Sequence, residues 1–159
     1  MSTAYLHLGS NEEEPLKQLL KALRGIEEHI GHITAYSPFY KTEAWGNKDQ
    51  NDFINMAISV STDHKASTIL EKTQSIESSM GRVSKEKWSS RIIDIDIIFL
   101  DNEVINTSTF TLPHPHMETR NFVLIPMMDI AGDFIHPVLD KTVEDLYLSS
   151  PDTCEVILL

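Results

Sequence analysis

The stretch at residues 92–100, with the sequence IIDIDIIFL, restricts the fold of this 159-residue chain more than any other segment. Its β-branched and aromatic side chains predict a strand, and the following Asp101-Asn102 predicts a turn into a hairpin. Because side chains alternate along a strand, Asp94 and Asp96 are expected side by side on one face. The apolar side chains expected on the opposite face are Ile93, Ile95, Ile97 and Phe99.

Strand and helix patterns interleave along the rest of the chain. β-Branched or alternating stretches predict further strands at residues 4–8, 33–40 and 53–62. Apolar side chains at helical spacing predict two helices, which begin at residues 15 and 66 and end near Gly31 and Gly81. Later helices are expected at residues 121–131, although Pro126 opposes that pattern, and at residues 142–148, which begin with a Thr-x-x-Asp cap.

These patterns favour an α+β fold over a doubly wound parallel sheet, because the strands are few and short and one hairpin is clear. The first hundred or so residues fit a β-α-β-β-α-β order. We therefore expect a ferredoxin-like sandwich with a mainly antiparallel sheet, as one domain over residues 1–159. The polar stretches at residues 43–52 and 82–90 are expected to be loops, and both are expected to be mobile without ligand.

Charge and composition exclude several classes of protein. Acidic residues outnumber basic ones by 24 to 13, and the net charge of −11 opposes binding to nucleic acid. No apolar run reaches the roughly 20 residues that span a bilayer, so no membrane association is expected. The start of the chain does not resemble a signal peptide, and Cys154 is the only cysteine, which favours the cytoplasm. The phosphate-loop, dinucleotide-binding and hydrolase motifs are also absent from the sequence.

Two neighbouring carboxylates on one strand face need a positive partner, because like charges resist ionising together. Mg²⁺ binds one or two protein carboxylates and completes its coordination with water and substrate phosphates. Asp94 and Asp96 suit such a site. The pair is equally compatible with a solvated face of an edge strand, and the residues alone do not separate these two interpretations.

Arginines near this pair in the sequence are suited to a polyphosphate ligand. Arg82, Arg91 and Arg120 flank the predicted strand and hairpin, and guanidinium groups bind phosphate oxygens in a fork geometry. A single arginine is more often a surface ion-pair partner. His114 and His116 have the spacing of a metal site but lack a third soft ligand nearby, so a hydrogen bond from His114 to phosphate is the better hypothesis.

Motifs over most of the chain resemble the hydroxymethyldihydropterin pyrophosphokinases. The similar segments are residues 8–11 (LGSN), 37–42 (SPFYKT), 91–100 (RIIDIDIIFL), 102–106 (NEVIN), 112–114 (LPH) and 120–126 (RNFVLIP), together with Asn55, Gln74, Ile76, Glu77, Gly81 and Arg82. Only the last twenty or so residues lack such a match. The family has a ferredoxin-like sandwich, which agrees with the fold expected from the residue patterns.

The resemblance implies a role for each matching residue. Asp94 and Asp96 are expected to hold two Mg²⁺ ions on the phosphates of ATP, and Arg82 and Arg91 are expected to act beside them in catalysis. The residues expected to bind the pterin are Thr42, Trp45, Phe53, Asn55 and Phe122, with the two phenylalanines stacking on the ring and Asn55 reading its polar edge. Those expected to bind ATP are Gln74, Glu77, Arg82, Trp88, Arg91, Ile97, Thr111, His114 and Arg120.

The expected reaction is transfer of pyrophosphate from ATP to 6-hydroxymethyl-7,8-dihydropterin in folate biosynthesis, with no obligate protein partner. The chain departs from the family at Ser84 and at Ser89-Ser90, where a second basic residue and a Gly-Pro are usual. Loop closure and ATP affinity are therefore the properties that the resemblance transfers least. The alternatives are another Mg²⁺-dependent nucleotidyl or phosphoryl transferase on this fold, and a catalytically silent binding module.

Overall fold

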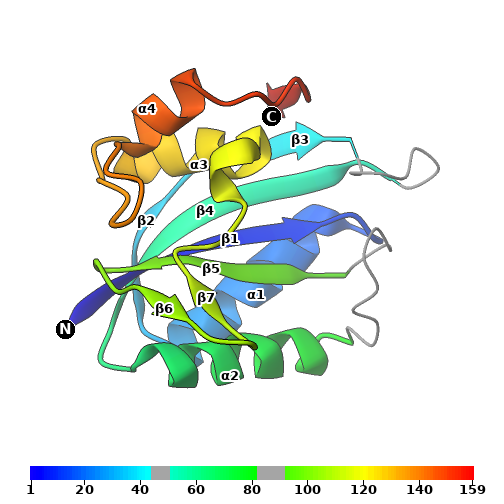
Figure 1. Cartoon of the computed structure of the whole chain (residues 1–159). Coiled ribbons are helices and arrows are strands. Elements are labelled where there is room, and N and C mark those ends of the chain that lie inside the picture. The colour runs from blue at the N-terminus through cyan, green and yellow to red at the C-terminus, as the bar shows by residue number, and fades with distance from the viewer. Residues whose placement is uncertain (44–50, 82–91) are drawn as a thin grey trace.

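The computed structural model describes residues 1–43, 51–81 and 92–159. Six strands form one antiparallel sheet (Figure 1). They are β1 (Ser2–Ser10), β2 (His32–Tyr36), β3 (Tyr40–Thr42), β4 (Phe53–Thr62), β5 (Asp94–Leu100) and β8 (Val156–Leu158). The order across the sheet is β5-β1-β4-β3-β8, and β2 also pairs with β4. The predicted α+β architecture with a mainly antiparallel sheet is confirmed.

Helices cover both faces of this sheet (Figure 1). α1 (Pro15–His29) and α2 (Ala66–Ser79) pack on one face, and α3 (Asn121–Ala131) and α4 (Val143–Leu148) pack on the other. The hairpin predicted from residues 92–100 and the segment after Asn102 does not form, because β5 pairs with β1. Instead, β6 (Ile105–Asn106) pairs with β7 (Thr111–Leu112) in a small hairpin after β5. A 3₁₀ helix at Met117–Thr119 then leads into α3. The chain thus crosses from one face of the sheet to the other after β7.

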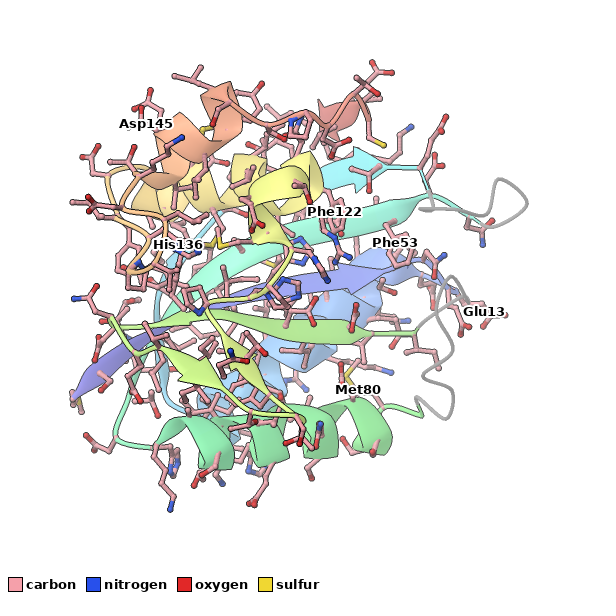
Figure 2. All side chains as sticks on the ribbon, in the orientation of Figure 1. Glu13, Phe53, Met80, Phe122, His136 and Asp145 are labelled. Atoms are coloured by element: carbon pink, nitrogen blue, oxygen red, sulfur yellow. The ribbon has the colours of Figure 1, made fainter. Side chains whose placement is uncertain are left out.

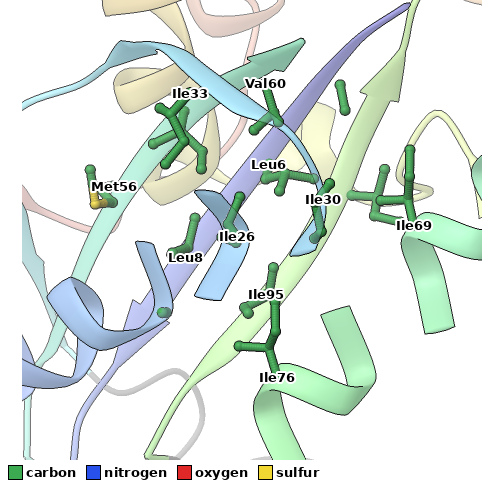
Figure 3. Packing of buried hydrophobic residues seen from close by; sticks show 14 of the residues in the cluster. Leu6, Leu8, Ile26, Ile30, Ile33, Met56, Val60, Ile69, Ile76 and Ile95 are labelled. Carbon is green, nitrogen blue, oxygen red and sulfur yellow. The ribbon is translucent and has the colours of Figure 1, made fainter. Parts of the chain in front are cut away.

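The larger hydrophobic core lies between the sheet and the first pair of helices. Figure 3 shows Leu6 and Leu8 of β1 packing with Ile26 of α1, and Ile95 of β5 packing with Ile76 of α2. These side chains are at most 6% exposed. Their burial, worth roughly 1.5–3 kcal/mol for each side chain, holds β1 and β5 rigidly against the helices. Alternate positions on the same strands are therefore fixed on the opposite face, below α3.

A β-bulge in β5 changes the expected alternation at the end of the strand. Leu6 pairs with Ile97 and Tyr5 pairs with Phe99, so Ile98 is an extra residue on β5. Phe99 consequently lies on the same face as α3, where its ring centroid is 4.5 Å from that of Phe134. The predicted placement of Phe99 with Ile93, Ile95 and Ile97 is wrong, because a bulge reverses the side-chain alternation beyond it.

Two further elements differ from the sequence patterns. The single strand expected at residues 33–40 is two strands, β2 and β3, and both pair with β4. The final residues form β8, which pairs with β3, so the end of the chain extends the sheet. Pairing with other parts of the chain decides both features. In contrast, α3 confirms the helix predicted at residues 121–131, with Pro126 buried inside it.

Candidate active site

The strand register brings the polar side chains of β1, β4 and β5 together below α3. Gly9 of β1 pairs with Asp94 on one side and with Asn55 on the other. His7, two residues earlier, pairs with Asp96 of β5. Because Leu6 and Leu8 belong to the opposite core, all of these positions face α3. Two carboxylates, an imidazole and an amide therefore share one surface of the sheet.

Asp94 and Asp96 have the arrangement expected from the sequence, on one face of β5 and both partly buried. The backbone between them is held by α2, which packs on the opposite side of the sheet. The N–H of Ile95 donates a 2.8 Å hydrogen bond to Oε2 of Glu77, a residue of α2 that is only 6% exposed. Glu77 was expected at the ATP, and the structure shows that it anchors the carboxylate-bearing strand to α2.

A pocket of about 300 Å³ opens beside Asp96, between β5, α2 and the hairpin of β6 and β7. Four residues expected from the sequence at the ATP or its metal line this pocket, namely Asp96, Ile97, Thr111 and His114. The loop between β6 and β7 adds the hydroxyl side chains of residues 107–109, and Leu70 of α2 adds an apolar wall. An apolar wall with hydroxyl and imidazole groups suits a flat heterocycle that carries phosphates.

His114 is held so that one ring nitrogen is available in this pocket. Its backbone N–H donates to the carbonyl of Ile98 at 3.0 Å. Its Nδ1 accepts a 3.3 Å hydrogen bond from the backbone N–H of His116, which assigns the ring proton of the neutral form to Nε2. Burial, aided by Arg120, lowers the pKa of His114 to about 4. At neutral pH the side chain is therefore a neutral donor through Nε2.

No group of three histidine, cysteine or acidic side chains within residues 1–43, 51–81 and 92–159 could hold a metal ion. His116 is exposed, and its ring centroid lies 6.4 Å from that of His114. His116 contacts His114 through its backbone N–H, which donates to Nδ1 of the His114 ring. The carboxylates of Asp94 and Asp96 are hard oxygen donors, and such a pair fits Mg²⁺ that is completed by water and phosphate rather than a closed protein site.

The described residues expected to bind the pterin lie on the β4 side of Gly9, opposite to Asp94. Nδ2 of Asn55 donates a 2.8 Å hydrogen bond to Oγ1 of Thr42, and the two side chains are 2% and 6% exposed. This bond fixes the amide so that its Oδ1 points toward Gly9, whose position leaves no room for a side chain. Phe53 of β4 and Phe122 of α3 lie at the same end of the sheet (Figure 2).

The remaining described residues that bear on the site are Arg120, His7 and Gln74. The Arg120 guanidinium carbon is 6.0 Å from the ring centroid of Phe122, and the same charge contributes to the lowered pKa of His114, so Arg120 lies near residues of both expected sites. His7 was missed from the sequence, although it lies below Phe122 with its Nε2 3.0 Å from the Phe122 carbonyl oxygen. Gln74 is exposed on α2. Trp45, Arg82, Trp88 and Arg91 lie outside the residues that the structure describes, as do most of the two expected loops.

The two buried histidines should make the protein less stable at acidic pH. Burial lowers the pKa of His7 to about 4, as it does for His114. Because an unfolded histidine titrates near 6.5, the unfolded chain binds protons first, so stability is lost as the pH falls from about 6.5 toward 4. We expect the free energy of unfolding to fall by on the order of 4 kcal/mol from about pH 7 to about pH 5, about half of it from each histidine.

Urea denaturation at several pH values measures this dependence. The His7→Gln variant should lose part of it, whereas His29→Gln, a change at an exposed position of α1, should keep all of it. A His7→Gln variant with the full dependence of the wild-type protein would show that His7 does not contribute.

The fold and this surface define a class of protein. Carboxylates on a rigid strand, beside a pocket lined by hydroxyl and imidazole groups, are typical of enzymes that bind a phosphorylated substrate through divalent cations. A sequence model of the 7,8-dihydro-6-hydroxymethylpterin-pyrophosphokinase (HPPK) family matches residues 5–132. The chain belongs to this family, which confirms the membership predicted from the sequence.

Curated relatives agree with this assignment. The chain is 38% identical over 138 residues to the 2-amino-4-hydroxy-6-hydroxymethyldihydropteridine pyrophosphokinase of Haemophilus influenzae, covering 86% of each protein. It is 36% identical over 145 residues to that of Aquifex aeolicus, covering 91% of this chain and 90% of the relative. The folic acid synthesis protein FOL1 of Dictyostelium discoideum is 37% identical over 148 residues, but the match covers only 22% of that protein.

Solved structures support the fold. The Plasmodium falciparum HPPK-DHPS crystal structure with pteroate matches with a TM-score of 0.75 and 18% identity. The match covers 92% of this chain but 42% of that one, so the chain spans less than half the length of this structural relative. Within the described residues, no helix is both long and apolar enough to cross a membrane.

Proposed function

We propose that this chain transfers the pyrophosphoryl group of ATP to 6-hydroxymethyl-7,8-dihydropterin in folate biosynthesis, and that it does so with Mg²⁺ on the surface around Gly9. Family membership confirms the predicted pyrophosphokinase activity. The roles of individual residues and the dependence on Mg²⁺ are the new part of this proposal. The observation that carries it is the register of β1, which sets the carboxylates of β5 and the amide of Asn55 on either side of a glycine.

On the pterin side, the residues bind the heterocycle and fix its orientation. Phe53 and Phe122 stack on the two faces of the heterocycle, and Oδ1 of Asn55 accepts a hydrogen bond from its polar edge. The bond from Asn55 to Thr42 keeps this oxygen in place when the site is empty. Because less side-chain motion has to be lost on binding, the fixed amide favours one orientation of the ring.

On the ATP side, the residues position the phosphates. The pocket beside Asp96 takes the nucleoside, Nε2 of His114 donates to a phosphate oxygen, and Arg120 offsets charge between the two ligands. Asp94 and Asp96 would hold two Mg²⁺ ions, which supply charge neutralisation on the triphosphate. With both ligands aligned, little covalent help from the protein is needed.

The reaction forms one bond to the β-phosphorus and breaks another. The hydroxymethyl oxygen of the pterin attacks this atom and loses its proton to the solvent, and the bond from the β-phosphorus to the oxygen that bridges it to the α-phosphorus breaks. AMP leaves with that bridging oxygen, and the pterin carries the diphosphate. An ordinary kinase would instead attack the γ-phosphorus and release ADP.

The nucleotide product therefore tests the proposal directly. After incubation of the protein with ATP, Mg²⁺ and the pterin alcohol, chromatography should show AMP and pterin diphosphate in equal amounts. Chelation of Mg²⁺ should abolish both products, and its re-addition should restore them. ADP formed in proportion to a pterin monophosphate would contradict the proposed reaction, and full turnover in the presence of the chelator would contradict the role of the metal.

A further inference from the structure

His7 occupies an unusual position on β1. It is 4% exposed and faces α3, with Asp96 as its cross-strand neighbour on β5. Its ring packs edge-on against Phe122, with the two ring centroids 5.6 Å apart and the planes at 63°. Its Nε2 lies 3.0 Å from the backbone carbonyl oxygen of Phe122. One buried side chain therefore touches both the ring and the backbone of the residue expected to cover the pterin.

The Phe122 carbonyl needs this contact because of a proline one helical turn further on. In an α-helix the carbonyl of each residue accepts from the N–H four residues later. For Phe122 that residue is Pro126, which has no N–H to donate. Without another donor, the carbonyl at the start of α3 would be a partly buried acceptor without its helical partner, and such a group costs roughly 1–3 kcal/mol when fully buried. His7 supplies the missing donor from the sheet.

The hydrogen bond also fixes the state of the imidazole. A carbonyl oxygen only accepts, so Nε2 must carry the proton and Nδ1 is left as an acceptor. Burial lowers the pKa of His7 to about 4, so the ring is neutral at neutral pH despite the nearby carboxylate of Asp94. A neutral ring does not compete with a cation for the carboxylates of β5.

We propose that His7 is a positioning residue for the pterin site: it replaces the helical donor that Pro126 lacks and thereby fixes Phe122 over the sheet. This role rests on the proposed function. His7 touches the first turn of α3 and lies beside the carboxylate-bearing strand, so it sets the distance between the aromatic cover and that strand. The expected consequence is a specific loss of pterin affinity when the donor is removed.

Two variants distinguish the effect of the His7 hydrogen-bond donor from the effect of His7 packing. His7→Leu replaces the imidazole by an apolar side chain of similar size without a donor, and His7→Gln keeps a donor that can reach the same carbonyl. We expect His7→Leu to weaken binding of the dihydropterin alcohol roughly tenfold, measured by its fluorescence, and His7→Gln to recover most of this loss. The affinity for a non-hydrolysable ATP analogue, measured by calorimetry, should change less than about twofold.

A second pair of variants tests the part played by the proline. Pro126→Ala restores a backbone N–H at position 126, so the Phe122 carbonyl no longer depends on His7. In that background, His7→Leu should weaken pterin binding less than about threefold, which gives a coupling between the two positions. Equal losses in the two backgrounds would overturn the proposed replacement of the helical donor.

One measurement needs no variant and stays informative if His7→Leu does not fold. Nitrogen chemical shifts of the wild-type imidazole at neutral pH should show a protonated Nε2 and an unprotonated Nδ1. The opposite tautomer would overturn the inference, as would unchanged pterin affinity in a folded His7→Leu variant. Wild-type protein that binds no pterin would instead contradict the proposed function.

Discussion

Replacing Asp94 or Asp96 by asparagine is expected to lower kcat/KM roughly a thousandfold or more while the protein stays folded. Each change removes one hard, charged ligand from the surface beside the ATP pocket but keeps the size of the side chain. Ile93, Ile95 and Ile97 on the opposite face of the strand still pack against α1 and α2. Because the amide also removes repulsion between neighbouring carboxylates, the free energy of unfolding should change by less than about 1 kcal/mol.

Asp101→Asn is the matched control for these variants. Asp101 follows β5 directly and accepts a 2.9 Å hydrogen bond from the N–H of Thr3. Its replacement by asparagine removes the same charge at the far end of the strand. Its activity should stay within about twofold of wild type. Steady-state assays at several Mg²⁺ concentrations, with urea denaturation in parallel, measure both quantities. Wild-type activity in Asp94→Asn or Asp96→Asn would show that the metal assignment is wrong.

Gly9→Ala is expected to lower pterin affinity by one to two orders of magnitude. A Cβ at this position would lie 2.8 Å from Oδ1 of Asn55 and 3.6 Å from Cδ1 of Phe53. Asn55 cannot turn away without breaking its bond to Thr42 and exposing a buried amide. The added methyl group therefore displaces the oxygen that reads the pterin, at a cost of roughly 1–3 kcal/mol for overpacking.

A second glycine provides the control. Gly25 of α1 faces the other core, where a Cβ would meet Cγ2 of Ile76 at 3.3 Å. Gly25→Ala adds the same methyl group away from the site, and its pterin affinity should match wild type. Fluorescence titration of both variants with the pterin alcohol makes the comparison. Equal affinities in Gly9→Ala and wild type would mean that the pterin does not lie beside Gly9 and Asn55.

Features that depend on local patterns or on family motifs could be predicted before the fold was known. Alternation along β5 predicted that Asp94 and Asp96 share a face, because side-chain direction on a regular strand depends only on position. The helices at Pro15–His29 and Ala66–Ser79 followed from apolar spacing and from glycine near their ends. The motifs around residues 91–100 and 120–126 predicted the family, which the comparisons confirmed.

Features that depend on pairing between distant segments became visible only in the folded chain. The bulge that moves Phe99 to the α3 face exists because Tyr5 and Leu6 of β1 pair with residues on either side of Ile98. β8 exists as a strand because β3 offers it an edge, although its own sequence carried no strand prediction. Neither event leaves a signal in the local sequence, since each depends on hydrogen bonds to a strand far away in the chain.

The same reason explains why His7 was missed. In the sequence it is one polar residue between two leucines, as on any half-buried strand. Its importance depends on two residues more than a hundred positions further along the chain, namely Phe122, whose carbonyl it contacts, and Pro126, which has no N–H. The sequence determined which residues are suited to the chemistry, whereas the folded sheet decided which of them meet, because contacts across strands and between strand and helix are set by packing.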